Sequence, residues 1–272
     1  MAKVKSLREL QLVELEILKD FVKFCQKNKL TYYISGGTFL GAVRHKGFIP
    51  WDDDIDVAMP RTDYARFIRL YDGKYVKSTF EDNSNLVHYA LQLIDKGAIV
   101  DTINGKTEAE WSAWIDVFPL DGMPNNFLLN KIHGTRLMIN RALFKLNTID
   151  QVQNKKGRPF SEKIIIKTAK IFNPWKKQNP QIRLRKIDKL LKKYPDTESN
   201  YYINFMGTYK LKSMLRKDVY YKDGAYYDFE NLKLFGPKEF DAYLTHIHGD
   251  YMTPPKVDDR NKHGTQLERT TK

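Results

Sequence analysis

The sequence predicts a mixed α/β (α+β) protein, in which a small mixed β-sheet is flanked by helices and a basic helical segment is inserted late in the chain. Short apolar runs of strand length alternate with longer stretches of helical periodicity, as in a sheet with helices packed against it. Apolar residues make up 42% of the 272 residues and aromatic residues 13%, which is enough to bury a core and argues against disorder.

The N-terminal half supplies most of the expected strands. Ser6 and Glu9 have the spacing of a capping box, and the apolar residues that follow recur at helical spacing. Pro60 is well placed to begin a helix directly after a strand. The elements expected in this half are a helix from Ser6 to about Lys27, a strand at 32–34, a short helix after Gly37, a strand at 52–59, a helix from Pro60, and strands at 75–80, 88–94, 98–102 and 113–118.

The C-terminal half is mainly helical before short strands return. From Pro124 to about Phe172 the pattern is helical, with a break predicted at 155–159 where Gly157 and Pro159 stand. The remaining expected elements are a basic helix from Gln181 to Tyr194, strands at 225–230 and 232–235, and a helix from Pro237 to about Ile247.

Composition excludes several classes of protein. The single cysteine, Cys25, rules out an internal disulfide framework and a thiolate zinc cluster. The N-terminus lacks the apolar run of a signal peptide, and no stretch reaches the ~20 apolar residues that span a bilayer. We therefore expect a cytoplasmic protein.

The most informative segment runs from residue 34 to residue 61. Glycines at the turn Gly36-Gly37 leave backbone N–H groups free to approach a phosphate closely. Along the strand expected after Pro50, Asp52, Asp54 and Asp56 share one face. Stacked carboxylates repel each other unless a cation lies between them, and such oxygen ligands suit Mg²⁺ or Mn²⁺. An Asp triplet alone is typical of a solvated turn, but the glycines before it and the strand after it favour a phosphoryl-transfer site.

These residues resemble the LicD family, the phosphocholine transferases that use CDP-choline. Its relatives include the fukutin-related ribitol-phosphate transferases, within the wider nucleotidyltransferase superfamily. The matching stretches are 7–11, 36–61, 114–121, 243–244 and 249–255. The resemblance implies a nucleotidyltransferase-like catalytic core over 1–124, a helical basic segment over 125–200, and strands and a helix over 201–272 that complete the catalytic domain.

The resemblance also implies roles for particular residues. Asp54 and Asp56 are expected to bind the metal, with Asp116 as the third metal ligand and catalytic carboxylate from a neighbouring strand. Two carboxylates on one strand and one from the next can hold the cations of an in-line displacement, which makes Asp116 the candidate general base. The expected substrate-binding residues are Ser35, Gly36, Gly37, Thr38, Arg44, His45, Lys46 and Trp51.

Ordinary structural roles stay open for several of these residues. Asp116 could be a hydrogen-bonded buried group, and Arg44 or His45 could pair with an Asp of the same loop. Trp51 and Trp114 could offer a face to a trimethylammonium group, although tryptophans more often serve packing.

Most of the net charge of +13 lies in one segment. Residues 155–193 contain 14 Lys or Arg and only two acidic residues, and residues 163–173 combine an apolar stripe with a lysine face. With Trp175 following, this pattern is typical of a helix at a membrane interface, and an ordinary core-packing helix with a solvated back is the alternative.

The leading hypothesis is a phosphotransferase that moves phosphocholine from CDP-choline to a sugar hydroxyl of a lipid-linked cell-surface glycan precursor, of teichoic acid or lipopolysaccharide type. CMP is released with Mg²⁺ (or Mn²⁺) at the inner face of the membrane. Another CDP-alcohol, such as CDP-ribitol or CDP-glycerol, would use the same site. A nucleotidyltransferase acting on RNA or a small molecule, and a non-catalytic membrane scaffold, are further alternatives. Nucleic acid is not the expected partner, because the basic segment lacks interleaved stacking aromatics. The oligomeric state stays open, with a homodimer as one alternative.

Overall fold

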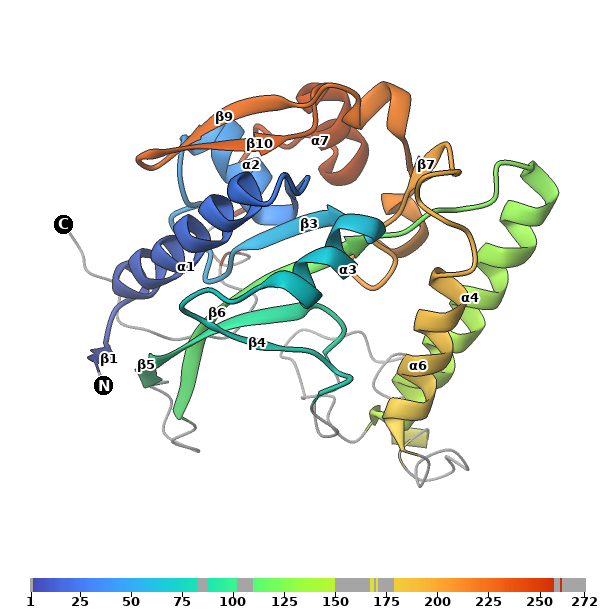
Figure 1. Ribbon diagram of the computed structural model, residues 1–272, viewed down its shortest axis with the longest axis horizontal. Coiled ribbons are helices and arrows are strands. Elements are labelled where there is room, and N and C mark those ends of the chain that lie inside the picture. The colour runs from blue at the N-terminus through green and yellow to red at the C-terminus, as the bar shows by residue number, and fades with distance from the viewer. Residues whose placement is uncertain are drawn as a thin grey trace.

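The computed structural model describes residues 2–82, 88–101, 110–149, 167–168, 170, 179–256 and 260. It confirms the predicted class: a mixed sheet with the order β1-β5-β6-β3-β2 and with β4 paired to β5, flanked by helices (Figure 1). The strands of this sheet are β1 (Ala2–Val4), β2 (Tyr33–Ile34), β3 (Asp56–Pro60), β4 (Val76–Ser78), β5 (Leu91–Asp101) and β6 (Glu110–Leu120). The helices are α1 (Leu7–Lys27), α2 (Gly36–His45), α3 (Arg61–Leu70), α4 (Phe127–Asn147), α6 (Pro180–Leu191) and α7 (Phe240–His248).

Helix α1 begins where the capping residues predict. The Ser6 hydroxyl accepts a hydrogen bond from the Glu9 N–H at 3.2 Å. The Glu9 carboxylate accepts from the Lys5 N–H at 2.8 Å instead of reaching back to Ser6, so only half of the predicted capping box forms.

Three details of the sheet differ from the sequence prediction. The predicted strands 88–94 and 98–102 belong to the single strand β5, whose pairing with β6 is interrupted by a bulge between Asp95 and Ile99. Strand β1, which the sequence did not predict, pairs in parallel with β5. The strand predicted at 52–59 begins only at Asp56, because residues 52–55 form an irregular approach to β3.

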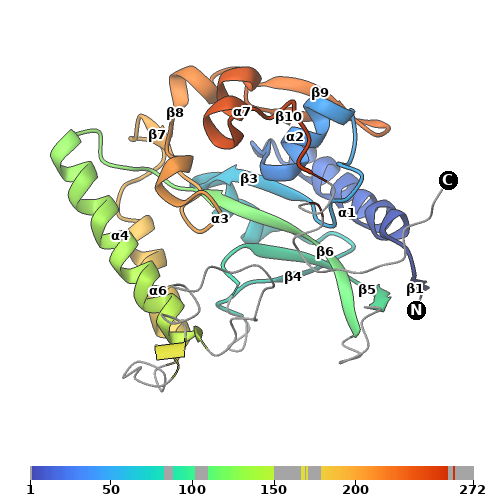
Figure 2. The same cartoon turned by 180° about the vertical axis from the view of Figure 1, so that it is seen from behind.

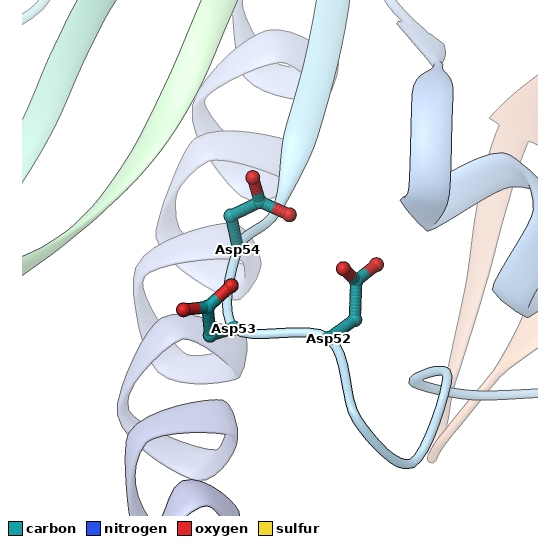
Figure 3. A group of neighbouring side chains, drawn as sticks. All are labelled: Asp52, Asp53 and Asp54. Atoms are coloured by element: carbon teal, nitrogen blue, oxygen red, sulfur yellow. The ribbon is translucent and has the colours of Figure 1, made fainter. Parts of the chain in front are cut away.

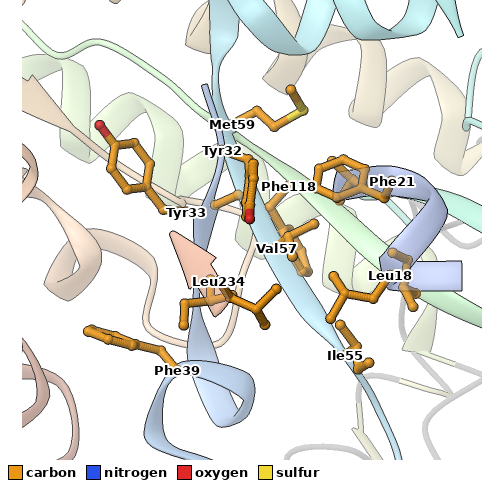
Figure 4. Packing of buried hydrophobic residues seen from close by; sticks show 14 of the residues in the cluster. Leu18, Phe21, Tyr32, Tyr33, Phe39, Ile55, Val57, Met59, Phe118 and Leu234 are labelled. Atoms are coloured by element: carbon orange, nitrogen blue, oxygen red, sulfur yellow. The ribbon is translucent and has the colours of Figure 1, made fainter. Parts of the chain in front are cut away.

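In the main hydrophobic core, β3 packs with residues of α1, α2 and α3 (Figure 4). The fully buried Phe21 of α1 packs with its ring 5.4 Å from Tyr32 and 5.2 Å from Phe67 of α3. Val57 and Met59 of β3 are equally buried. Burying each such side chain contributes ~1.5–3 kcal/mol, so the start of β3, where the acidic residues lie, has a rigid foundation.

A second core joins α4 and α6. Asn126 caps α4 by accepting from two backbone N–H groups, and Asn179 with Pro180 begins α6. Figures 1 and 2 show the two helices side by side at one edge of the molecule. The buried side chains of this cluster that join them are Leu137 and Phe144 of α4 and Leu184, Ile187 and Leu191 of α6.

Of the basic segment 155–193, the structure describes only residues 167, 168, 170 and 179–193, so the predicted interfacial helix at 163–173 lies largely outside the described residues. Among the helices that are described, none has the length and hydropathy needed to traverse a bilayer. The C-terminal part contributes the predicted hairpin of β9 (Ala225–Phe229) and β10 (Leu232–Gly236), and a small pair of β7 (Tyr201–Tyr202) and β8 (Leu215–Arg216).

Candidate active site

A cavity of about 810 Å³ lies at the end of the sheet where β3 begins. Its floor and walls come from β3, β6, the start of α2, α7 and the loop at 204–209. Ser35, Gly36 and Gly37 line it, and so do the carboxylates Asp52, Asp54, Asp56 and Asp116. The turn and the acidic residues that the sequence analysis selected therefore face a single cavity.

Sheet register brings the acidic residues together. Asp56 and Asp116 are opposite each other on the parallel strands β3 and β6, so their side chains leave the same face of the sheet. The Asp116 N–H also donates to the Ile55 carbonyl at 2.9 Å, which extends the pairing to the residue before β3. Asp52 and Asp54 line the cavity with them, although they precede the strand and strand alternation does not apply to them.

Asp53 belongs to a different grouping. It is buried and is not among the residues that line the cavity, yet one carboxylate oxygen from each of Asp52, Asp53 and Asp54 lies within 4.8 Å of the other two. Figure 3 shows the three side chains on the bend that leads into β3. Two overlapping sets of carboxylates could thus hold a cation: 52, 53 and 54, or the predicted 54, 56 and 116.

The charges of this cluster are poorly compensated by the protein itself. Desolvation and the neighbouring Asp54 and Asp116 carboxylates hold the pKa of Asp56 well above its usual range. Desolvation and repulsion by Asp54 and Asp53 raise the pKa of Asp52 to about 8, against a smaller opposite effect of Arg44.

Two buried carboxylate oxygens in the described part of the chain also lack a compensating contact. Among the described residues, Oδ1 of Asp116 and Oε2 of Glu14 are buried without a hydrogen-bond partner. A buried, unpaired carboxylate oxygen is costly, and a divalent cation relieves both the repulsion and the missing contacts. The residues present therefore fit an Mg²⁺ or Mn²⁺ ion.

The first turn of α2 faces these carboxylates with its backbone. Ser35 is the N-cap, but its side chain makes no capping hydrogen bond. Gly36 has φ +54°, and a Cβ there would lie 2.8 Å from Oδ2 of Asp56. A Cβ on Gly37 would lie 2.3 Å from Oδ2 of Asp52. Glycine is therefore required for the helix N-terminus, a natural anion-binding site, to come this close to the carboxylates of Asp52 and Asp56.

The other predicted substrate-binding residues do not line the cavity. The Thr38 hydroxyl accepts a hydrogen bond from the Asp56 N–H at 2.8 Å and so positions the start of β3. Arg44 donates to the Tyr251 carbonyl at 2.5 Å, and Lys46 is exposed with φ 55° at the end of α2. The rings of His45 and Trp51 lie 6.1 Å apart, edge to face. Contact of Arg44, His45 and Lys46 with the diphosphate, and of Thr38 and Trp51 with other parts of the substrate, stays a prediction.

Several residues near the site escaped the sequence analysis. Glu14 of α1 is 1% exposed, and desolvation together with Asp54 and Asp53 holds the pKa of its carboxyl well above its usual range. Its signal was available, since a charged residue at position 14 interrupts an apolar helical stripe.

The sequence around His88 gave no indication that this residue lies at the site. Its Nε2 lies 3.2 Å from Oδ2 of Asp116. Burial lowers the pKa of His88, but the contact with Asp116 outweighs burial and raises it overall. The loop at 204–209, held by Arg141 of α4 through the carbonyls of Phe205 and Gly207, also lines the cavity.

A second, more open hollow of about 500 Å³ adjoins the cavity. Trp114 of β6 borders both spaces. The other residues that line the hollow are Gln92, Ile94, Lys96 and Ile99 of β5 and Ser112 of β6. Trp114 thus connects the cavity with the acidic cluster to this hollow.

Comparison with known proteins first indicates a nucleotidyltransferase domain and then identifies the family. Residues 29–149 match the family model described as the nucleotidyltransferase domain of LicD, FKTN and FKRP, a range that includes the glycine turn and all four cavity carboxylates. The chain is also 31% identical over 274 residues to the lipopolysaccharide cholinephosphotransferase LicD of Haemophilus influenzae, covering 96% of this chain and 97% of that protein. The chain belongs to the LicD family, as its motifs predict.

Shorter matches are to uncharacterized proteins of two Rickettsia species. The protein of Rickettsia typhi is 42% identical over 55 residues, which is 20% of this chain and 18% of that protein. The protein of Rickettsia prowazekii is 46% identical over 48 residues, which is 18% of each chain.

Proposed function

We propose that this protein transfers phosphocholine from CDP-choline to a sugar hydroxyl of a cell-surface glycan precursor and releases CMP. The observation that carries the proposal is the meeting of Asp54, Asp56 and Asp116 with the glycine-bearing first turn of α2 in one cavity. The name of the Haemophilus influenzae relative, a lipopolysaccharide cholinephosphotransferase, supports phosphocholine as the transferred group and a glycan as the acceptor.

The residues of the cavity divide the work of the transfer. Asp54, Asp56 and Asp116 would hold Mg²⁺ or Mn²⁺, which supplies charge neutralisation for the diphosphate and for the departing CMP phosphate. The free N–H groups at the start of α2 donate to phosphate oxygens of the donor. The acceptor hydroxyl attacks the phosphorus that carries choline, and the bond from that phosphorus to the CMP oxygen breaks in line.

Proton transfer falls to Asp116 in this proposal. The acceptor hydroxyl gives up its proton as the new phosphorus–oxygen bond forms, and the Asp116 carboxylate accepts it. His88, 3.2 Å from Oδ2 of Asp116, holds that carboxylate in place. The open hollow beside Trp114 offers the acceptor sugar an aromatic face next to the reacting atoms. In this proposal the acceptor is lipid-linked, so the reaction takes place at the inner face of the membrane. The basic segment 155–193 would also favour binding of the protein to that surface.

A CMP-release assay tests this proposal. The protein is incubated with CDP-choline, Mg²⁺ and a lipopolysaccharide or teichoic acid acceptor, and acceptor-dependent release of CMP is expected. Asp56→Asn and Asp116→Asn each lower the rate by ~10³-fold or more, because each removes a charge that holds the cation. Asp228→Asn, an exposed change on β9 that removes an ion pair with Lys233, keeps the wild-type rate.

Donor comparison in the same assay separates the close alternatives. CDP-choline is expected to give the highest kcat/KM, and a higher value with CDP-ribitol or CDP-glycerol would assign the same site to that alcohol. Absence of CMP release with every donor and acceptor would refute the transfer reaction.

A further inference from the structure

Helix α4 has an outer face whose large apolar side chains are exposed. Leu128 is 64% exposed, Ile132 49% and Ile139 54%. At ~100° per residue these three positions fall within about 40° of one another on the helix. Phe127, 73% exposed, and Met138 lie to one side of this stripe, about 80–100° from Leu128. Single exposed apolar residues are ordinary, but a contiguous patch on one helix marks an interaction surface.

The opposite face of α4 is already used for packing. Leu137 and Phe144 are buried against α6 in the second core. A helix that is apolar on two sides needs a packing partner on each side. Among the described residues, α6 and the chain around it supply only the inner one.

Charge indicates what covers the outer side. The 21 residues of α4 contain no Asp or Glu, while Lys131, Arg136 and Lys145 carry positive charge. The neighbouring α6 adds Arg and Lys residues, and its single acid, Asp188, is buried and bonded to Tyr89. A second copy of the chain docked symmetrically on this face would bring the same cations together, which is unfavourable. An anionic surface with an apolar interior satisfies both kinds of residue.

We propose that the outer face of α4 docks on an anionic lipid bilayer, with Leu128, Ile132 and Ile139 in the acyl boundary and Lys131 and Arg136 at the headgroups. In Figures 1 and 2 the α4–α6 pair forms one edge of the molecule, on the side away from β1, where a flat surface can reach it. On its inner side the same helix holds the wall of the catalytic cavity through Arg141. Docking therefore brings the cavity beside the membrane, where a lipid-linked acceptor resides.

This surface differs from the basic segment predicted at 155–193, and it does not depend on the transfer reaction. Vesicle binding is measured without donor or acceptor, so failure of one proposal leaves the other standing.

Cosedimentation of the full chain with vesicles tests the proposal. Vesicles of phosphatidylcholine are compared with vesicles that also contain about one-third phosphatidylglycerol. Wild-type protein is expected to bind the anionic vesicles. Leu128→Glu with Ile132→Glu lowers the partition coefficient at least ~10-fold. Lys131→Gln with Arg136→Gln lowers it on anionic vesicles by about fivefold per charge removed.

A matched control makes the same chemical change elsewhere. Leu12 of α1 and Val76 of β4 are 46% and 41% exposed, and Leu12→Glu with Val76→Glu is expected to bind as wild type. Thermal unfolding of each variant shows that the fold is kept.

Three results would overturn the proposal. Wild-type protein fails to bind anionic vesicles, the α4 pair of glutamates binds as wild type, or the control pair loses as much binding as the α4 pair. Light scattering adds a fourth: a wild-type dimer that Leu128→Glu with Ile132→Glu converts to a monomer would assign this face to a second copy.

Discussion

Single residues of the cavity are held by contacts that tolerate little change. Asp56 is aligned by the Thr38 hydroxyl on its N–H and by its register with Asp116. Gly36 and Gly37 leave no room for a side chain against the carboxylates. Two sets of carboxylates overlap at Asp54, and substitution of members found in only one set distinguishes them.

Substitution of Asp53 and of Asp116 distinguishes the two candidate metal sites. If 54, 56 and 116 hold the cation, Asp116→Asn lowers Mg²⁺ affinity at least ~10-fold, whereas Asp53→Asn changes it less than about threefold. Isothermal titration calorimetry with MgCl₂ measures both. The opposite order would move the metal site to 52, 53 and 54.

Gly37 allows a test of the close approach between the first turn of α2 and the carboxylates. Gly37→Ala places a Cβ 2.3 Å from Oδ2 of Asp52, so the carboxylate or the first turn of α2 must shift. We expect kcat to fall ~10²-fold for a displacement near 1 Å, with little loss of folding stability. The control Gly249→Ala has no atom within 4 Å of its new Cβ, although its φ of +76° adds some strain. Equal kcat for wild type and Gly37→Ala would contradict the close approach.

His133 makes stability depend on pH. Burial and the cations Lys193 and Arg136 lower its pKa to about 4, below the ~6.5 of an unfolded chain. Its contribution to stability is complete above pH ~6.5 and is lost as the pH falls toward 4, by up to about 3 kcal/mol.

His133→Phe keeps the edge-to-face contact with Tyr194 and removes the titrating group. Urea unfolding at pH 7.5 and pH 5 is expected to show a smaller loss for this variant. Some loss persists, because burial also lowers the pKa of His248 to about 4. Identical losses in wild type and variant would exclude the role of His133.

At the scale of elements, a buried ionic network ties the α4–α6 pair to the sheet. Arg61, the first residue of α3, donates to Asp121 at 2.6 and 2.9 Å and to the Tyr89 hydroxyl at 2.7 Å. Tyr89 in turn donates to Asp188 of α6 at 2.7 Å. Arg61 thus links the end of β3 to the helix that packs on α4.

Removal of Arg61 leaves buried carboxylates without their cation. Arg61→Leu is expected to lower the free energy of unfolding by about 3–5 kcal/mol. The control Lys19→Leu breaks an exposed pair with Glu16 within α1 and costs less than ~1 kcal/mol. Urea denaturation measures both, and similar losses would show that the network is not a structural link.

At the scale of the whole molecule, the proposed cation would couple its binding to folding. The acidic cluster draws on α1, the approach to β3 and β6, so an ion bound there would bridge elements that are far apart in the chain. An ion that binds only the folded state stabilises it by about 2.7 kcal/mol at a concentration of 100 Kd.

Magnesium is therefore expected to raise the unfolding temperature by several degrees over protein in EDTA. Asp56→Asn with Asp116→Asn abolishes this increase. In EDTA the double variant is at least as stable as wild type, because it removes repulsion between desolvated carboxylates. Differential scanning calorimetry measures both effects, and a double variant that still responds to Mg²⁺ would place the ion elsewhere.

The sequence determined the elements whose signals are local. The cap at Ser6, the apolar periodicity of α1, the glycine turn and the hairpin of β9 and β10 all follow from neighbouring residues, and the structure agrees. The motif around residues 36–61 also identified the family.

Tertiary structure alone decided what meets across the chain. The pairing of β1 with β5, the place of Glu14 beneath the acidic cluster and the contact of His88 with Asp116 depend on the packing of distant segments. So does the exposed face of α4, whose apolar residues could equally have faced the core. Local patterns specify which side chains avoid water, but the energy of packing selects their partners, and that energy exists only once the segments meet.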